Sequence, residues 1–434
     1  MKNLALFSGI VVSLLVGVGR VDAATRCVKP GGGSGCFSSI NAAIAAASAG
    51  DTIQVAHGTY AEDVVIDKAL ALIGDNDDNT TIDASGKLNG VNVDGLHHPG
   101  LAHVVVTGFT VENAELEGII VSNASDVTVR DNRVRRNNLG LDTTSGTCPE
   151  VAPPDSHAGE DFDCGEGIHL SGVDHSTVAT NLVEHNSGGI LLTDDSGPTH
   201  DNLISGNIVR DNVFDCGITL ASHVPLMFAP NGNGVFHNTI ANNESSGNGT
   251  AIEGAGAGVG IFTPAPGTAA YANVVIGNRL VNNGLPGVAL HSHAPGQNLN
   301  DNQIIGNFIA GNGADTEDTA TPGPTGINIA SGRGPGGNVV GSAITGTVVS
   351  HNVIEREAVA VAVSDPAGVE IDLHLNDLVN DHHVGVANLG AGSVNAIENY
   401  WGCPAGPGGG GCSTVSGPNV TFTPPLRHRV HEHP

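Results

Sequence analysis

Basic residues are scarce in this 434-residue chain, and the shortage excludes several partners. The sequence has 16 Lys and Arg against 44 Asp and Glu, which gives a formal net charge of −28. Binding to the phosphates of nucleic acid or to an anionic membrane surface requires a basic patch, which this composition can hardly supply. We therefore expect no nucleic-acid partner.

Cysteine and methionine are also few. None of the seven cysteines forms the Cys-x-x-Cys spacing of a structural zinc site. The presence of only two methionines argues against a thioether route for Cu(I). In an oxidising compartment, three pairs of cysteines that are close in sequence are predicted to form disulfides, and Cys216 has no such partner in the sequence. These pairs are Cys27 with Cys36, Cys148 with Cys164, and Cys403 with Cys412.

Long apolar runs are absent except at the start of the chain. Residues 1–23 carry Lys2, then an apolar run from Leu4 to Val18, then small residues ending at Ala23. This order is typical of a secretory signal peptide, and the run is too short to span a membrane. We expect a secreted or periplasmic protein with no membrane span.

Glycine is abundant and a repeat dominates the rest of the sequence. The 62 Gly and 22 Pro exclude a helical bundle, while 39% hydrophobic residues are enough for a core. The repeated unit is Asn-x-(Val/Ile/Leu)-x-x-Asn followed by Gly-(Ile/Val)-x-(Leu/Ile), with tightest spacings of 24 and 23 residues. Its first Asn recurs at Asn132, Asn181, Asn207, Asn238, Asn278, Asn307, Asn352, Asn376 and Asn399. A second column is Asn137, Asn186, Asn212, Asn243, Asn283 and Asn312, and a third is Asn202, Asn233, Asn273 and Asn302.

Such a repeat predicts an all-β, single-domain solenoid. Short period-2 strands separated by Asn-marked corners stack as parallel coils about 4.8 Å apart, and neighbouring coils bury the apolar side chains together. Residues 24–60 are expected to form an N-terminal cap with a short helix from Ile40 to Ala47. Residues 61–415 are expected to form the coils, and residues 416–434 a tail.

On these features the chain resembles the right-handed parallel β-helix, or pectin-lyase-like, superfamily. The resemblance covers the mature chain, from the Ile40-Asn41-Ala42-Ala43-Ile44 segment to Glu398-Asn399-Tyr400-Trp401. It implies the fold and not the activity. The sequence lacks the paired Arg and Trp-x-Asp-His of pectate lyases, the Gly-His-Gly and Arg-Ile-Lys of polygalacturonases, and the Tyr-Gly-x-Asp-Pro-His of alginate epimerases.

A binding groove is predicted beside three insertions that leave the same corner of the coil. The insertions are residues 138–166, 244–257 and 313–325. Along the strands that follow, alternation sends Ile168 and Leu170 inward and their neighbours outward. The outward residues predicted to bind substrate are His169, Thr193, Thr219, Phe262 and Asn328.

Candidate catalytic residues stand at the next corner. They are Asp194, Asp195, His223, His291 and His293. Asp195 and His223 are expected one coil apart, close enough for the carboxylate to orient the imidazole. Carboxylates and imidazoles in a groove suit acid–base work on a sugar chain. Asp and His are also ordinary corner residues, so solvated corners are the alternative.

The first insertion carries acidic residues that are candidates for Ca²⁺ binding. Asp161, Asp163 and Glu166 offer the oxygen ligands that Ca²⁺ takes, and a cation would bridge an acidic protein to an acidic polymer. The alternative is an acidic surface loop without a metal.

Two classes of function fit the sequence. The first is a secreted lyase, epimerase or hydrolase, acting as a monomer on an extracellular, acidic polysaccharide. The second is a non-catalytic protein that binds glycans or serves as a surface or periplasmic accessory. A weaker resemblance is to periplasmic β-helix proteins that assist copper-site assembly. Insertions on one face of a solenoid mark binding, but they do not distinguish binding from turnover.

Overall fold

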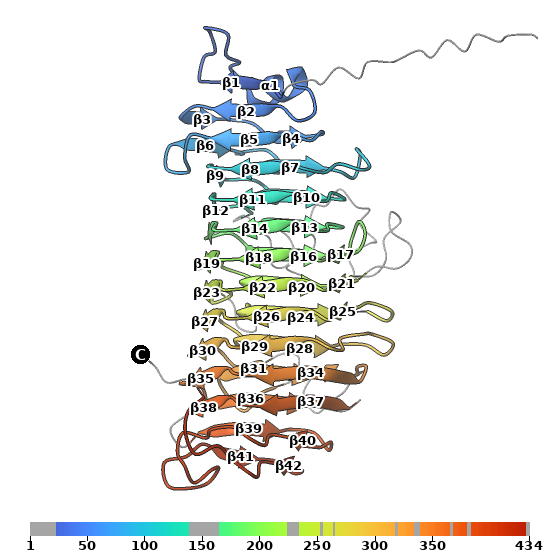
Figure 1. The fold of residues 1–434 in the computed structure, drawn as a ribbon, viewed down its shortest axis with the longest axis vertical. Coiled ribbons are helices and arrows are strands. Elements are labelled where there is room, and N and C mark those ends of the chain that lie inside the picture. Colours follow the sequence, from blue (N-terminus) through green and yellow to red (C-terminus); the bar gives the residue numbers. More distant parts are fainter. Residues whose placement is uncertain are drawn as a thin grey trace, which may run out of the picture.

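The chain winds into a tall stack of coils (Figure 1). The computed structural model describes residues 23–138, 165–223, 234–251, 255–263, 265–316, 320–333, 339–364, 368–379 and 383–430. In these segments the backbone forms one helix, α1 (Ile40–Ala46), and 42 strands. Their pairing is parallel, apart from β32 (Gly332–Arg333) with β33 (Val339–Val340). The all-β parallel β-helix predicted from the repeat is confirmed.

Three long sheets run along the stack, and each complete coil contributes one strand to each. The 14-stranded sheet contains β1 (Thr25–Val28), β2 (Thr52–Val55), β5 (Ala71–Gly74), β8 (Val105–Thr107), β11 (Thr128–Arg130), β14 (Thr177–Ala179), β18 (Leu203–Ser205), β22 (Thr239–Ala241), β26 (Val274–Ile276), β29 (Gln303–Ile305), β34 (Ile344–Ser350), β37 (Val369–His374), β40 (Val394–Asn395) and β42 (Val420–Thr421). The 11-stranded sheet contains β3 (Gly58–Tyr60), β6 (Thr80–Asp83), β9 (Thr110–Glu112), β12 (Arg133–Arg135), β15 (Leu182–Glu184), β19 (Ile208–Arg210), β23 (Glu244–Ser246), β27 (Arg279–Val281), β30 (Phe308–Ala310), β35 (Val353–Glu355) and β38 (Asp377–Val379).

The third long sheet, of 12 strands, carries the candidate site. It contains β4 (Val64–Ile66), β7 (Val91–Asp94), β10 (Ile119–Ser122), β13 (Glu166–Ser171), β16 (Gly188–Thr193), β20 (Ile218–Ala221), β24 (Val259–Thr263), β28 (Val288–Ser292), β31 (Thr325–Ala330), β36 (Val359–Ser364), β39 (Val384–Asn388) and β41 (Thr414–Ser416). A short sheet follows its corner, made of β17 (Thr199–His200), β21 (Val235–Phe236) and β25 (Ala270–Tyr271). Among the described residues, no helix is both long and apolar enough to cross a membrane.

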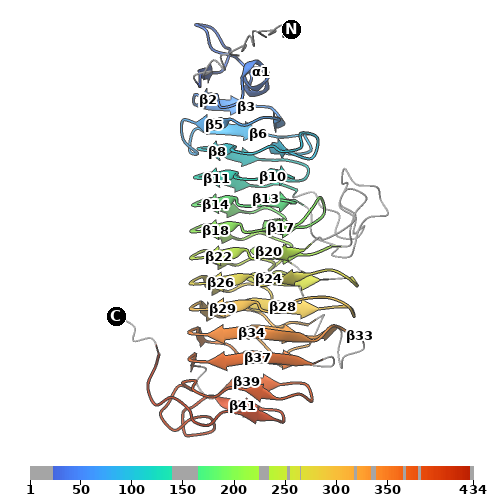
Figure 2. The same cartoon turned by 45° about the vertical axis from the view of Figure 1, so that its right-hand side comes forward.

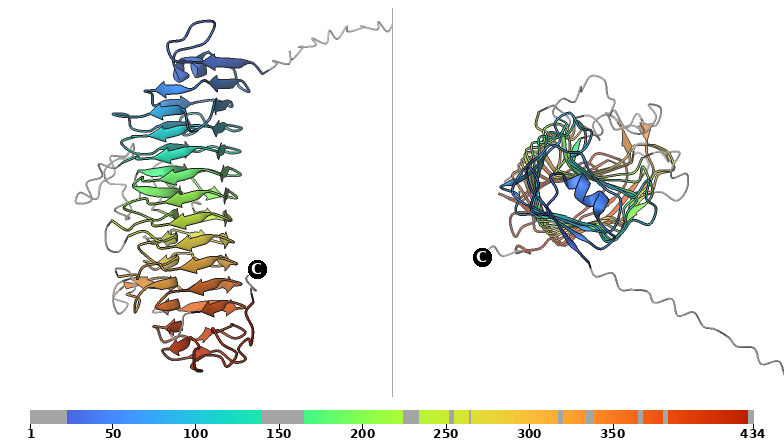
Figure 3. Two further views of the ribbon diagram at one scale, coloured as in Figure 1. Left: turned by 90° about the vertical axis from the view of Figure 1, so that its left-hand side faces the viewer. Right: turned by 90° about the horizontal axis from the view of Figure 1, so that it is seen from above.

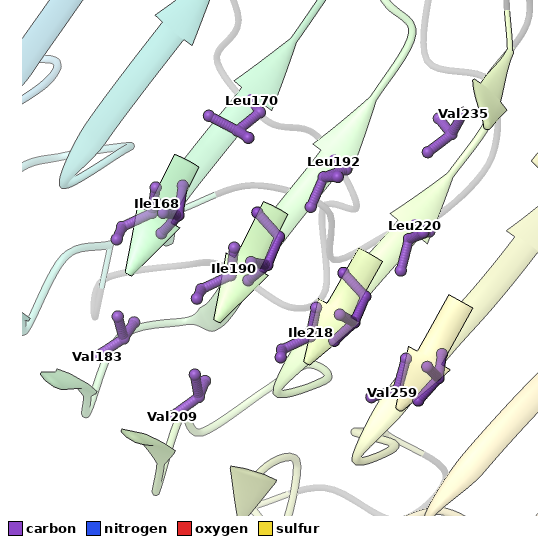
Figure 4. Packing of buried hydrophobic residues seen from close by; sticks show 14 of the residues in the cluster. Ile168, Leu170, Val183, Ile190, Leu192, Val209, Ile218, Leu220, Val235 and Val259 are labelled. Carbon is purple, nitrogen blue, oxygen red and sulfur yellow. The ribbon is translucent and has the colours of Figure 1, made fainter. Parts of the chain in front are cut away.

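The core is a set of vertical columns of aliphatic side chains. Ile168 pairs in register with Ile190, and Ile190 with Ile218, so equivalent residues of successive coils lie directly above one another (Figure 4). All three are buried in one continuous cluster. Each such side chain contributes about 1.5–3 kcal/mol by leaving water, and it can do so only when the next coil covers it.

Ladders of buried asparagines hold the corners. The backbone N–H and Nδ2 of Asn132 both donate to Oδ1 of Asn181 in the next coil, at 3.1 Å each. The first ladder runs through Asn132, Asn181, Asn207, Asn243, Asn278, Asn307, Asn352, Asn376 and Asn399. The second runs through Asn137, Asn186, Asn212, Asn248, Asn283 and Asn312 and ends on Glu357, and the third through Asn202, Asn238, Asn273 and Asn302.

The predicted alignment of the repeat was wrong at one coil. Asn243, rather than Asn238, stands between Asn207 and Asn278, while Asn238 belongs to the third ladder. Asn248 correspondingly takes the place in the second ladder that was predicted for Asn243. These asparagines are five residues apart, as the ladders themselves are. Ile240 fits the aliphatic position of the repeat, whereas Ser245, which pairs with Val209 in the structure, does not. The second insertion therefore starts after Asn248, five residues later than predicted.

The N-terminal end of the stack is closed. Seen from above, α1 lies across the open end of the first coil (Figure 3), and it buries Ile40 and Ile44 there. Ser39 caps the helix by accepting from the backbone N–H of Ala42, and the Glu62 carboxylate accepts from the backbone N–H of Ile40. These contacts fix the helix over the apolar end.

Two of the three predicted disulfides are present. Cys27 is bonded to Cys36 at the N-terminal end, and Cys403 to Cys412 at the other end, close to the buried Trp401. Cys148 and Cys164 lie outside the described residues, as does the predicted signal segment except for its last residue.

Candidate functional site

The outer face of the 12-stranded sheet is covered over much of its length. Figure 2 shows β13, β20, β24 and β28 stacked along this face. Side chains alternate inward and outward as predicted, but the outward His169, Thr219 and Asn328 are only 4%, 2% and 0% exposed. At the start of the same sheet the outward Val65 is 37% exposed. The outward column is therefore buried at these three positions, and the role of its residues in substrate binding stays a prediction.

Asp195 and His223 meet at the corner that follows this sheet. The corners after β16 and β20 are neighbours because Thr193 pairs with Ala221. His223 Nδ1 lies 2.8 Å from Asp195 Oδ1, and the two side chains are 12% and 18% exposed. This contact is the one that the repeat register predicts. It is partly buried, which strengthens the interaction, and partly open to solvent.

The charge state of Asp195 follows from its surroundings. Burial alone would raise the pKa of its carboxyl group. The charge of His223 and its hydrogen bond outweigh burial, with help from His169 and from the Thr193 hydroxyl, and hold the pKa well below its usual range. Asp195 is therefore a fixed anion that orients His223.

Asp194 has the opposite environment. It is 1% exposed; Oδ2 accepts from the Ser222 hydroxyl and Oδ1 from the backbone N–H of His223, at 2.9 and 2.8 Å. Burial raises the pKa of Asp194 to about 6, and the neighbouring Asp195 adds to the increase. Both oxygens of Asp194 thus hold the corner that carries His223, which makes it a positioning residue in this geometry.

A polar chain leads from this corner back to the preceding coil. His169 Nε2 is 2.9 Å from Thr193 Oγ1, and Thr193 in turn hydrogen-bonds to Asp195. On its other side His169 Nδ1 is 3.2 Å from Glu117 Oε1. Thr219, a further predicted residue, pairs in register with Leu191 in the same outward column, and the contacts named here do not involve it. Thus His169 and Thr193 join the Asp195–His223 pair in one network.

The remaining predicted histidines form a second cluster. His293 follows β28, two coils from His223, as the repeat predicts. Its ring stacks on Phe262 with centroids 6.2 Å apart, and Phe262 also contacts His291 at 5.5 Å. His291 Nε2 lies 3.5 Å from Asp315 Oδ2, and Asn328 Nδ2 donates to the same oxygen at 2.9 Å. His291 and Asp315 are 2% and 3% exposed, so this imidazole–carboxylate pair is enclosed.

Three of the residues in these clusters were not predicted as site residues. Ser222 directly precedes the predicted His223, and Asp315 lies in an insertion that carries no repeat. Glu117 had a usable signal, because Glu-Gly-Ile occurs both at residues 117–119 and at residues 166–168. Residues at equivalent positions of successive repeats are neighbours in the stack, so this match predicts that Glu117 lies next to Glu166.

Ca²⁺ binding by the three predicted ligands stays a prediction, since the structure describes only Glu166 of the three. Asp161 and Asp163 lie outside the described residues. Glu166 is buried at the start of β13, and its carboxylate, a carboxylate oxygen of Glu117 and a ring nitrogen of His169 all lie within 4.8 Å of one another. The described neighbours of Glu166 therefore include an imidazole, a donor that an all-oxygen Ca²⁺ site does not use.

Comparisons with known proteins identify the fold. The family model described as a right-handed β-helix region matches residues 71–261. A search of curated proteins finds no match.

Solved structures with the same fold share little sequence with the chain. The A-module of mannuronan C-5 epimerase from Azotobacter vinelandii superposes with a TM-score of 0.51 at 14% identity, over 88% of this chain and 94% of the module. The catalytic unit of an α-1,3-glucanase from Streptomyces thermodiastaticus gives 0.53 at 15%, over 89% and 66%. The Dettilon tailspike protein gives 0.52 at 13%, over 91% and 68%. At such identities the likeness concerns the fold alone.

Proposed function

Because the chain folds as a right-handed parallel β-helix, we propose that it is a secreted or periplasmic protein that binds and processes an extracellular acidic polysaccharide. The observation that carries the proposal is the Asp195–His223 pair, half-sheltered at a corner of the 12-stranded sheet. Support for a carbohydrate substrate comes from similarly folded proteins whose names describe an epimerase and a glucanase. The two disulfides fit an oxidising compartment.

The pair is suited to proton transfer. Since the Asp195 carboxylate can only accept, the proton of neutral His223 sits on Nδ1 and leaves Nε2 as the basic nitrogen. Asp195 also stabilises the imidazolium that forms when Nε2 takes up a proton. In the proposed reaction, Nε2 removes the proton from the carbon next to a uronate carboxylate. In a lyase the electron pair then expels the neighbouring glycosidic oxygen, which takes a proton from water or from the imidazolium. In an epimerase the carbon instead accepts a proton from water on the opposite face.

Proton abstraction fits this corner better than glycoside hydrolysis. A hydrolase needs two carboxyl groups on opposite sides of the scissile bond, about 5–9.5 Å apart. Here Asp194 and Asp195 are consecutive, and both Asp194 oxygens accept hydrogen bonds within the protein. Asp194 therefore has no route to a leaving oxygen in this conformation.

A second candidate function is glycan binding without turnover. It is favoured by the burial of Thr193, Thr219 and Asn328, which are 0%, 2% and 0% exposed and so serve the interior of the protein in this conformation. A surface or periplasmic accessory protein needs no catalytic base. In that case the histidine–carboxylate pairs would only stabilise the corners of the coils.

The test is an activity screen of the full chain against uronate polymers, with and without added divalent cation. Lyase activity appears as ultraviolet absorbance from unsaturated products, hydrolysis as new reducing ends, and epimerisation as deuterium uptake at C5. We expect proton abstraction, and we expect His223→Ala to reduce it by about 10²–10⁴-fold, the usual contribution of a general base.

The matched control is His175→Ala. His175 also pairs with an aspartate at a corner, with Nδ1 2.7 Å from Asp174 Oδ1, but its side chain is 62% exposed and lies outside the polar network. This variant should keep full activity. Retention of activity by His223→Ala would place the site elsewhere, and binding without any product would establish the accessory function instead.

A further inference from the structure

Two glutamates are stacked in adjacent coils inside the protein. The repeated Glu-Gly-Ile segment places Glu117 and Glu166 just before equivalent positions, because Ile119 pairs with Ile168 in the parallel register. Adjacent parallel strands are about 4.8 Å apart. The two residues are 5% and 1% exposed. Two carboxylates so close and so sheltered from water repel each other strongly unless a cation lies between them.

His169 completes the group. Its Nδ1 lies 3.2 Å from Glu117 Oε1. One ligand atom from each of the three residues lies within 4.8 Å of the other two. Within the described residues, Glu117 Oε2 is buried and has no hydrogen-bond partner. The group is thus an imidazole and two carboxylates, with an unsatisfied buried oxygen among them.

The hydrogen-bond chain sets the tautomer of His169. The Thr193 hydroxyl bonds to the Asp195 carboxylate, which can only accept, so Thr193 donates to Asp195. Its oxygen is then the acceptor for His169 Nε2–H at 2.9 Å. In neutral His169 the lone pair is therefore on Nδ1, which faces the glutamates. A metal-binding histidine commonly donates its other ring N–H to a polar partner in this way.

The backbone leaves room for these side chains. Gly188 pairs with Glu166 one coil further along the sheet. A Cβ on Gly188 would lie 2.9 Å from Glu166 Oε1 and 3.2 Å from its Cγ. Any larger residue at position 188 would push the Glu166 carboxylate out of its place.

We propose that Glu117, Glu166 and His169 bind a divalent metal ion of the Zn²⁺ or Mn²⁺ class. One imidazole with two carboxylates is a donor set for such ions, whereas Ca²⁺ takes six to eight oxygen ligands. Bonds of about 2.0–2.2 Å to a shared ion require the ligand atoms to approach by roughly 1 Å, which side-chain rotation allows. The ion neutralises the stacked carboxylates and locks the coils of β10 and β13 together. The site does not depend on the proposed catalytic role of His223.

The experiment is metal titration of the full chain after treatment with a chelator. Isothermal titration with Zn²⁺, Mn²⁺ and Ca²⁺ should give one site for Zn²⁺ or Mn²⁺ that is tighter than any for Ca²⁺. The bound ion should also raise the melting temperature. Glu117→Gln and His169→Gln should each weaken binding by at least about tenfold, since even outer-sphere changes have that effect. Co²⁺ provides a second readout, because its visible spectrum reports the loss of the nitrogen ligand in His169→Gln.

His175→Gln serves as the control, since it removes an exposed imidazole while the three proposed ligands are left in place. It should bind like the parent. Circular dichroism establishes that the variants are folded, and Glu117→Gln is nearly isosteric. Equal affinity in the parent and in both ligand variants would overturn the proposal. A preference for Ca²⁺ over Zn²⁺ and Mn²⁺ would also overturn it. If no metal binds at all, the proposal fails and an imidazolium of His169 between the two carboxylates accounts for the cluster.

Discussion

At the scale of single residues, Asp194 and Asp195 show how position in a coil decides the chemistry of a side chain. The two carboxyl groups are consecutive in sequence, yet the pKa of Asp195 is held below its usual range while burial raises the pKa of Asp194 to about 6. Asp195 contacts the imidazole of His223, whereas Asp194 faces neutral donors. The corner therefore contains one fixed anion and one carboxyl group that titrates in a mildly acidic range.

Asp194 should make stability depend on pH. Its raised pKa means that, between pH 4 and pH 6, the folded protein binds more protons than the unfolded chain. The free energy of unfolding should therefore fall as the pH rises through this range and level off above it. Asp194→Asn keeps one acceptor oxygen for the backbone N–H of His223, places an amide N–H toward the Ser222 hydroxyl, and cannot ionise. Its stability relative to the parent should increase by up to about 3 kcal/mol from pH 4 to pH 7.

Urea unfolding of both proteins across this range measures the effect. Asp201→Asn, a change at an exposed corner aspartate, controls for the loss of one negative charge. A parent and an Asp194→Asn variant whose difference in stability does not change with pH would contradict the assignment.

At the scale of elements, the asparagine ladders are the feature that defines a coil. Asn243 uses all its polar atoms in them: its Nδ2 donates to Ile204 O and Asn278 Oδ1, and its Oδ1 accepts from Nδ2 and the backbone N–H of Asn207. An amide is needed because it donates and accepts at once. Each ladder thus ties every coil to the one before and the one after.

Asn243→Asp should be strongly destabilising. A carboxylate cannot donate to Ile204 O or Asn278 Oδ1, and it places a charge in a buried ladder, so we expect a loss of about 3–5 kcal/mol. Asn242→Asp is the matched control, because Asn242 is the exposed neighbour and such changes usually stay within about 0.5 kcal/mol. Thermal and urea unfolding compare the two variants. Equal losses in both would mean that the ladder contributes little.

The end of the second ladder provides another prediction. The backbone N–H and Nδ2 of Asn312 both donate to Glu357 Oε1 at 3.0 Å, where the pattern would otherwise place an asparagine. Burial raises the pKa of Glu357 to about 7. Parent stability should thus decline as pH rises from about 4.5 to 7, as the folded state loses protons that it holds more tightly than the unfolded chain.

Glu357→Gln keeps the acceptor and removes the ionisation. It should match the parent near pH 4.5 and exceed it by up to about 3 kcal/mol at pH 8. Melting temperatures at the two pH values provide the measurement, and Glu355→Gln, a change at a half-buried glutamate in the adjacent strand β35, provides the comparison. A variant that is less stable than the parent at pH 8 would refute this account.

At the scale of the whole molecule, the stability and solubility of the stack depend on the helix that covers its N-terminal end. A solenoid exposes unpaired strand edges at each terminus, and α1 covers the first of them with Ile40 and Ile44. Ile44→Asp would put a charge against the apolar end of the first coil. We expect this variant to be less stable and to self-associate through the uncovered end.

Light scattering coupled to size-exclusion chromatography can detect the association. Ala45→Asp introduces the same residue at the neighbouring exposed position and should leave the mass of the particle unchanged. Identical elution of the two variants and the parent would mean that the helix is dispensable for blocking the edge.

The sequence predicts those features that the coil period controls. The parallel strands and the meeting of Asp195 with His223 follow from counting residues along the repeat, and the capping helix follows from the amphipathic Ala/Ile stretch that precedes it. The burial of His169, Thr219 and Asn328 does not, because the period fixes the direction of a side chain and not what encloses it. The enclosed His291–Asp315 pair arises in the same way, from an insertion whose path no period fixes.

The five-residue interval shared by the ladders has a consequence for how such a chain finds its native state. A strand that joins the growing stack five positions out of step still meets an asparagine at each bend, as the segment from Asn238 to Asn248 illustrates. Slippage of this kind is corrected only when the longer strands of the 12-stranded sheet seat their own apolar residues. Refolding is therefore expected to pause in slipped forms until the strands of the 12-stranded sheet pair in their native register.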